Sequence, residues 1–252
     1  MSQGNQHGEF YIGYLPRAPA GTARFLRPFV IAAVLGVFAV SLALGLRQEE
    51  MDRGDFEFGV ERSYQGTLSA GPIPILHTAY RVYILVGDGK FGAGPWAEKW
   101  ASEAKGHEVM LRGTLIQRKP LAMLEVDRQS HPKILPSVAA PVNQLATQTI
   151  GDVELQGELV DTKCYLGVMR PAVGKGHRAC AIRCLSGGVP PGILIRNQRI
   201  DTSVMILLEG TDGKPNVVSA QWAGRTIQAQ GRLAIRGGLP VLEVHELGLS
   251  LR

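Results

Sequence analysis

The sequence lacks a cluster of basic residues, and it has only one long hydrophobic run and three cysteines. Charged residues make up 19% of the 252 residues, aromatic residues 6%, and the formal net charge is +5. The basic residues are scattered and are not interleaved with aromatic side chains, so nucleic-acid binding is not indicated. No Gly-rich phosphate loop follows a strand-like run and no Gly-x-Ser-x-Gly motif occurs. Classical nucleotide and hydrolase chemistry therefore have no support, and an enzyme is not indicated.

The only long hydrophobic run extends from Phe29 to Leu46 and is free of charged residues. Its length of roughly 18 residues is near the lower limit for a helix that crosses a bilayer. Arg17, Arg24 and Arg27 precede the run and acidic residues follow it, which predicts a cytoplasmic N-terminus and an exported body. We therefore expect a single-pass protein of a bacterial inner membrane with a periplasmic C-terminal domain. A cleaved signal peptide is the alternative, and it exports the same domain.

Glycine and proline are abundant, with 31 and 15 residues, and they separate short strand-like runs. The body also contains an internal repeat. GHEVMLRGTLIQRKPLAMLEV (106–126) aligns without a gap with GRTIQAQGRLAIRGGLPVLEV (224–244), and YILVGDGK (83–90) corresponds to MILLEGTDGK (205–214). Many short strands with glycine at the bends suit a small closed barrel. The predicted fold class is all-β, with two tandem OB-like small barrels preceded by one transmembrane helix.

This pattern divides the chain into successive segments. We expect a cytoplasmic tail (1–27), a transmembrane helix (28–46), a juxtamembrane linker (47–62), a first OB-like unit (63–128), a linker rich in Pro, Ser, Thr and Gln (129–150), and a second OB-like unit (151–252). A short helix is predicted after Pro95, with Trp96 and Trp100 on a core-facing side. The second unit differs from the first by an insertion at residues 160–193.

The insertion holds all three cysteines of the chain. Cys164 follows a strand-like run, and His177, Cys180 and Cys184 follow later at the spacing i, i+3 and i+7, which places three side chains on one helical face. Pro171, Gly174 and Gly176 favour a loop before His177, so the predicted helix covers HRACAIRCL and is about two turns long. Convergent thiol and imidazole groups indicate a metal or redox site.

The patterns VDTKCYLGVM and HRACAIRCLSGGVPP resemble a motif of uncharacterised bacterial membrane-anchored or exported proteins with a strand-rich domain, VDxKCYLGxM…HRxCAxxCxxGGxPP. The resemblance covers the insertion and its flanking strand. It implies that Cys164, His177, Cys180 and Cys184 form one unit, and it implies no particular reaction.

Three interpretations of the unit remain open. A Cys3His set suits a structural zinc site, and Met169 as a further donor would suit copper. A disulfide between Cys164 and either Cys180 or Cys184 would fasten the helix to the barrel in an oxidising compartment. A redox-active thiol is the third interpretation, although no Cys-x-x-Cys motif accompanies it.

Other candidates are weaker. Asp161 could orient a ligating histidine, though an aspartate at a strand end is commonly a turn residue. His245 or His177 could ligate a non-covalent haem, while His77, His107 and His131 are expected at the surface. The predicted function is a membrane-anchored metal-binding (zinc, copper or iron) or redox accessory subunit of an electron-transfer or metalloenzyme assembly, with protein partners. The alternative is a non-catalytic interaction or assembly module with a disulfide staple.

Overall fold

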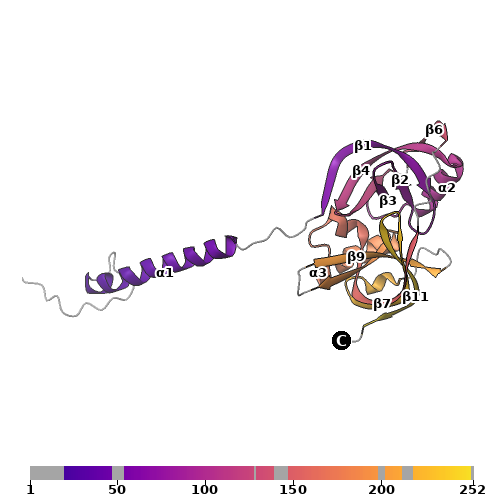
Figure 1. The fold of residues 1–252 in the computed structure, drawn as a ribbon. Helices are drawn as coiled ribbons and strands as arrows, with labels where there is room; N and C mark the ends of the chain where they lie inside the picture. Colours follow the sequence, from indigo (N-terminus) through magenta and orange to yellow (C-terminus); the bar gives the residue numbers. More distant parts are fainter. Residues whose placement is uncertain are drawn as a thin grey trace, which may run out of the picture. The chain divides into compact units, whose positions relative to one another are not determined.

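The computed structural model of this protein describes residues 20–46, 54–127, 129–138, 147–197, 202–211 and 218–250. The chain divides into two compact units, residues 1–51 and 52–252. The helix expected at the N-terminus belongs to the first unit, and the strand-rich body forms the second (Figure 1).

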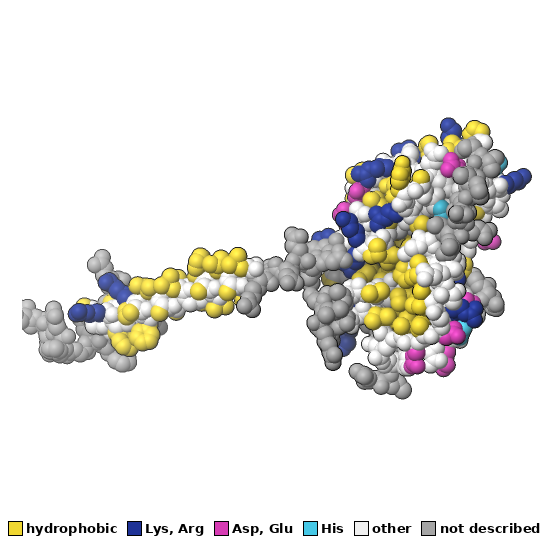
Figure 2. Space-filling model, viewed as in Figure 1, with side chains coloured by type: hydrophobic (Ala, Val, Ile, Leu, Met, Phe, Trp, Pro, Cys, Tyr) yellow, Lys and Arg dark blue, Asp and Glu magenta, His cyan; other side chains and the backbone are white. Residues whose placement is uncertain are grey.

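The first unit contains the helix α1 (Ala20–Leu46), in which no residue is buried. Helix α1 is long and apolar enough to cross a membrane. An N-terminal signal sequence meets the same two criteria. Hydrophobic side chains cover most of it and basic ones gather at one end (Figure 2). The helix starts before the predicted 28 and continues through Pro28, because the preceding Arg and Leu residues favour helix. Residues 1–19, with Arg17, and 47–53 lie outside the described residues.

The second unit begins with a six-stranded sheet in the order β1-β2-β3-β5-β4-β6. Because β1 also pairs with β4, the first five strands form a closed circuit of pairings. A helix, α2, connects β3 to β4 with Pro95 in its first turn, as predicted. The elements are β1 (Asp55–Ser69), β2 (Ile75–His77), β3 (Val82–Gly87), α2 (Gly94–Ala104), β4 (His107–Arg118), β5 (Leu121–Val126) and β6 (Lys133–Val138).

The remaining strands form a closed five-stranded barrel in the order β10-β11-β9-β8-β7. The Cys/His insertion lies between β7 and β8 and contains one π-helical turn, η1, and one α-helix, α3. The elements are β7 (Gln148–Asp161), η1 (Cys164–Val168), α3 (Gly174–Ser186), β8 (Pro191–Asn197), β9 (Thr202–Gly210), a short 3-10 turn η3 (Ala220–Trp222), β10 (Thr226–Arg236) and β11 (Leu239–Leu249).

The strand registers agree with the internal repeat. The β1–β4 pairing sets Gly66 opposite Val109, and the β7–β10 pairing sets Gly157 opposite Ile227. The parallel pairing of β3 with β5 joins Ile84 to Met123, and that of β9 with β11 joins Leu207 to Val241. Each pair in the second sheet is the sequence-aligned counterpart of the pair in the first. The two halves therefore share strand order and register.

Three strands begin within expected linkers, and one of them is β7, which starts at Gln148 inside the linker 129–150. Strand β1 begins at Asp55, within the expected juxtamembrane linker and before Ser63, because Asp55 and Phe56 pair with the end of β4. Strand β6 lies within the expected linker 129–150, where Ile134 pairs with Val109 of β4. The sequence pattern did not reveal the start of β1 or strand β6, because each pairs through its backbone and few of its side chains are buried. Residues 139–146 of that linker and the Asp212-Gly213 turn lie outside the described residues.

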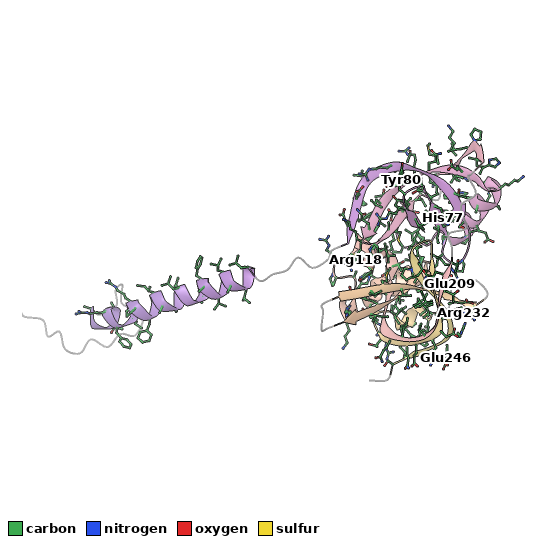
Figure 3. The ribbon with its side chains drawn as sticks, viewed as in Figure 1. His77, Tyr80, Arg118, Glu209, Arg232 and Glu246 are labelled. Carbon is green, nitrogen blue, oxygen red and sulfur yellow. The ribbon has the colours of Figure 1, made fainter. Side chains whose placement is uncertain are left out.

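The hydrophobic core has three parts. One cluster fills the first sheet around Trp100, and a second fills the barrel around Leu242. The third joins the two halves and contains equivalent positions from each, together with side chains of the insertion. Figure 3 shows Arg118 and Glu209 where the two halves meet. The third cluster includes Ile84, Leu121 and Met123 from the first half, Leu207, Leu239 and Val241 from the second, and Cys164, Leu166 and Cys184 from the insertion.

Candidate metal and thiol site

The insertion presents its cysteines from two short helical segments. Strand β7 ends at Asp161, Cys164 opens η1, and α3 carries the other two cysteines. Helix α3 starts at Gly174, earlier than the predicted His177, so the expected loop glycines form its first turn. The backbone N–H of Gly174 donates to the Glu158 carboxylate, and a negative charge at a helix N-terminus is favourable. This contact fixes the start of α3 against the second barrel.

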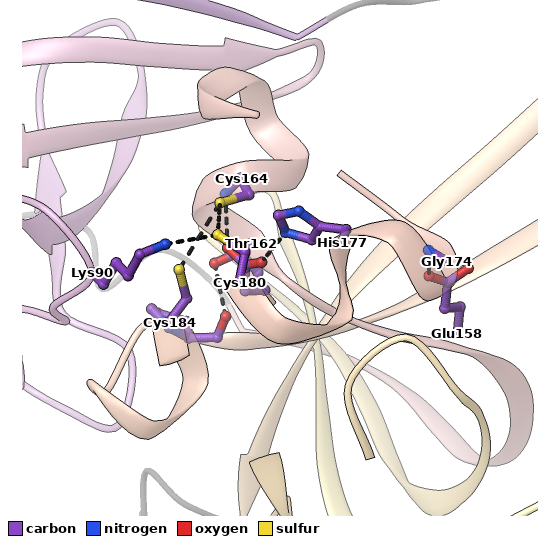
Figure 4. Close-up of polar contacts among 10 residues, drawn as sticks. Lys90, Glu158, Thr162, Cys164, Gly174, His177, Cys180 and Cys184 are labelled. Atoms are coloured by element: carbon purple, nitrogen blue, oxygen red, sulfur yellow. Dashed lines mark hydrogen bonds and ion pairs between the residues drawn. The ribbon is translucent and has the colours of Figure 1, made fainter. Parts of the chain in front are cut away.

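The three cysteine sulfur atoms converge between these segments (Figure 4). The Cys164 Sγ lies 3.9 Å from the Sγ of Cys180 and 3.9 Å from that of Cys184. All three are free thiols; Cys164 and Cys184 are buried and Cys180 is half-buried. The predicted convergence of the cysteines is therefore present, and the sulfur atoms are not bonded to one another.

A lysine of the first half of the body completes the cluster. Lys90, in the segment after β3, points its ammonium group at Cys180, with Nζ 2.8 Å from Sγ (Figure 4). The Gly92 N–H donates to the Gly187 carbonyl at the end of α3 (2.9 Å). A Cβ atom on Gly92 would lie 1.9 Å from the Gly188 carbonyl oxygen, so only glycine permits this approach. The site is thus built by both halves.

A buried lysine of the insertion, Lys163, contacts the segment that carries Lys90. Lys163 is 1% exposed, and its ammonium donates to the carbonyls of Gly87 and Gly89, both at 2.7 Å. It also forms an ion pair with Glu125 on β5. A buried charge is tolerated only when it is paired and hydrogen-bonded, and Lys163 meets both conditions. The residues on either side of Asp88 are therefore anchored to the insertion.

Asp161 connects His177 with the cysteine cluster. One carboxylate oxygen accepts the backbone N–H of Cys164 (2.8 Å) and the other lies 2.8 Å from Nε2 of His177. Ligand atoms of Asp161, Cys164 and His177 lie within 4.8 Å of one another, as do those of the three cysteines, so Cys164 belongs to both groups. The His177 Nδ1 atom is buried and has no hydrogen-bond partner among the described residues.

The two buried thiols share a hydrogen bond, and their pKa values shift in opposite directions. The hydrogen bond between Cys164 and Cys184, together with burial, raises the pKa of Cys164. The same hydrogen bond lowers the pKa of Cys184, with the Lys90 charge contributing. The hydrogen bond to Cys180 raises the pKa of Lys90, so the ammonium form beside the sulfur atoms is favoured.

The other predicted candidates, Met169 and the remaining histidines, are not part of this cluster. Met169 is 41% exposed, and its backbone N–H reaches the Cys164 carbonyl at 3.5 Å. His245 and His131 are exposed, whereas His77 and His107 are half-buried, less exposed than predicted. Trp100 is 1% exposed and its ring contacts that of Trp96 at a tilt of 59° in the core of the first half, as predicted.

No protein-family model and no curated protein sequence matches the chain. Its function must therefore be inferred from the geometry of the site. Sequence reasoning identified the cysteines, His177 and Asp161, but it missed Lys90 and the contacts of Lys163 with Gly87, Gly89 and Glu125. The Gly-Asp-Gly-Lys stretch that carries Lys90 is a turn signal in the sequence, and nothing in its pattern connects it with cysteines about 90 positions further on.

Proposed function

We propose that the body of this protein binds a thiophilic metal ion through Cys164, Cys180 and Cys184. The observation that carries the proposal is the sulfur spacing of 3.9 Å from Cys164 to each partner. Thiolates bound to zinc at ~2.3 Å in tetrahedral or trigonal geometry lie ~3.8 to 4.0 Å apart. Disulfide sulfur atoms lie ~2.05 Å apart. The spacing therefore suits three thiolates around one ion.

His177 is the proposed fourth ligand. Histidines that bind a metal through one ring nitrogen usually donate the other to a carboxylate, and Asp161 occupies that position at Nε2. The unpaired Nδ1 is then available as a donor atom, because the Nε2 hydrogen bond to the carboxylate fixes this tautomer. A Cys3His set suits zinc best, with copper or iron as the other thiophilic candidates. The Lys90 ammonium balances part of the thiolate charge.

The strand pairings and the composition of α1 also support a particular fold and location. We infer that both halves are OB-like barrels, an assignment supported by two circuits of five strands with equal order and register. We also infer that α1 anchors the chain in a bacterial inner membrane with its N-terminus in the cytoplasm. Arg24 and Arg27 at the start of the apolar segment support this orientation.

A metal site outside the cytoplasmic membrane suits an accessory subunit of a membrane-associated electron-transfer or metalloenzyme assembly. Four protein ligands would close the site, which favours a structural or transfer role over catalysis at an open position. The proposed protein partners would then contact the body that holds the ion.

Metal analysis of the purified full-length chain tests the proposal. Protein prepared under reducing, metal-replete conditions should contain about one zinc, copper or iron ion per chain, and its thiols should react with a thiol reagent only after chelation. Cys184→Ser and His177→Ala should both lower metal content. A metal-free chain with one disulfide and one free thiol would contradict the proposal and would favour the interaction module with a disulfide staple.

A further inference from the structure

The three cysteines differ in access to solvent. Cys164 and Cys184 are 2% and 1% exposed, whereas Cys180 is half-buried and lies on the side that Lys90 approaches. A molecule from solution therefore reaches the Cys180 sulfur first. Behind it lies Cys164, whose sulfur is 3.9 Å away and which is equally close to Cys184. This arrangement places one accessible sulfur in front of a buried sulfur that can attack it.

The Lys90 ammonium is fixed beside the accessible sulfur. Its Nζ atom lies 2.8 Å from the Cys180 Sγ, so a positive charge faces the negative charge that a sulfur atom carries when it attacks a disulfide. Lys163 holds the carbonyls of Gly87 and Gly89, and Gly92 is hydrogen-bonded to the end of α3, so the segment that carries Lys90 is tied on both sides of it. The cluster thus combines an accessible nucleophile, a positioned cation and a second thiol within reach.

We propose that this cluster is a thiol–disulfide exchange site, in which Cys180 attacks an external disulfide and Cys164 resolves the mixed disulfide. The substrate class is a small-molecule or protein disulfide. The exchange itself does not depend on a metal ion; only its consequence for metal content rests on the proposed function.

The exchange proceeds in two steps. The Cys180 thiolate attacks one sulfur of an R–S–S–R molecule, a Cys180–S–S–R bond forms and one RS⁻ leaves. The Cys164 thiol then loses its proton and attacks Cys180 Sγ, the second RS⁻ leaves and a Cys164–Cys180 disulfide remains. The two protons lost by the cysteines convert the two leaving groups to RSH. Two cysteines are oxidised and one external disulfide is reduced to two thiols.

Exchange and metal binding compete for the same sulfur atoms. A Cys164–Cys180 disulfide leaves Cys184 as the single remaining thiol of the three, which cannot hold an ion that needs three thiolates. Oxidation should therefore release the metal, and a bound metal should slow oxidation by occupying the attacking sulfur. The external redox state would then set the metal content of the protein.

The experiment uses the reduced full-length chain in detergent, with and without one equivalent of zinc. Glutathione disulfide is added, the reaction is stopped by an alkylating reagent at set times, and adducts are located by mass spectrometry. A glutathione adduct on Cys180 should appear first and convert to a Cys164–Cys180 disulfide, with one zinc released per disulfide formed. Zinc-loaded protein should react more slowly than the metal-free protein.

Two sets of variants test the assigned roles. Cys164→Ser should accumulate the Cys180 adduct without resolving it, and Cys164→Ala serves the same purpose where the serine variant does not fold. Lys90→Gln should slow adduct formation about threefold to tenfold, because it removes the positive charge that contacts the attacking Cys180 sulfur. Lys99→Gln is the matched control, since Lys99 is an exposed lysine paired with Glu103 on α2, and it should react at the wild-type rate.

Several results would overturn the exchange site: a first adduct on Cys164 or Cys184, a Cys180 adduct that persists in the wild-type chain, or equal rates for Lys90→Gln and wild type. The metal site fails separately. A chain that binds no zinc yet forms the adduct and then the disulfide would retain the exchange site and refute the metal site. A chain that binds zinc but does not react once zinc is removed would retain the metal site and refute the exchange site.

Discussion

At the scale of single residues, the site depends on Asp161, which is fully buried and orients two neighbours. One of its oxygens accepts the Cys164 N–H and the other faces His177, so a single carboxylate sets the position of a thiol and of an imidazole. Buried carboxylates are costly unless their hydrogen bonds are made, and these two contacts offset that cost. Asp161 is therefore the positioning residue of the cluster.

Asp161→Asn keeps an oxygen for the Cys164 N–H but replaces the carboxylate that faces His177 with a neutral amide. We expect the fold to persist and metal affinity to fall by about 10- to 100-fold, the usual cost of removing such a partner. Competition titration against a chelating indicator measures this change. Asp152→Asn is the control, because Asp152 is 78% exposed and lies 3.8 Å from Arg232. Equal affinities for the two variants would contradict the role of Asp161.

At the scale of elements, α3 is fixed at both ends by contacts that its own sequence does not specify. Its first N–H bonds Glu158 of β7, and its C-terminal glycines contact the segment after β3. Isolated helices of this length are marginal in water, so these contacts and its buried face must stabilise it. The cysteine geometry therefore depends on how closely α3 approaches the first half of the body.

Gly92→Ala tests that approach. The added methyl group would lie against the Gly188 carbonyl, so α3 and the Lys90 segment must separate. We expect the free energy of unfolding to fall by about 1 to 3 kcal/mol, as for other overpacking substitutions. Urea denaturation followed by tryptophan fluorescence measures the loss. Gly94→Ala is the control, since a Cβ there meets no atom within 4 Å, and a comparable loss in that variant would refute the argument from close approach.

At the scale of the whole body, the two halves share a hydrophobic core. The cluster that joins them includes Ile84 and Leu207, aligned positions of the repeat, and both are fully buried. Linked domains that contact each other through a small polar interface unfold separately, whereas a large apolar interface couples them. Lys163 adds a buried polar contact from the insertion of one half to the backbone of the other.

We therefore expect the body to unfold in one transition although it contains two similar sheets. Scanning calorimetry of the full-length chain should give one peak for the body, with equal calorimetric and van't Hoff enthalpies. Lys163→Ala leaves Glu125 and two carbonyls without their cation, and it should move this single peak to lower temperature. Two resolved peaks in the wild-type chain would show that the halves are independent.

The sequence by itself determined the elements that depend on local pattern. Charge-free hydrophobicity predicted the helix around Phe29, alternation and glycine predicted the strands, and the i, i+3, i+7 spacing predicted the cysteine face of α3. The repeat also located the insertion, because a segment without a counterpart in the other half is visible by alignment. These features follow from neighbours along the chain.

Only the tertiary structure decided which distant groups meet. Lys90 lies in a turn of the first half, and its contact with Cys180 arises because the two sheets pack on equivalent faces and bring that turn against α3. Strand β6 likewise depends on pairing with an edge of β4, which its own sequence does not reveal. Hydrophobic burial between the halves sets these distances, and no local pattern encodes them. The three thiols were predictable from sequence, whereas the charge beside them was not.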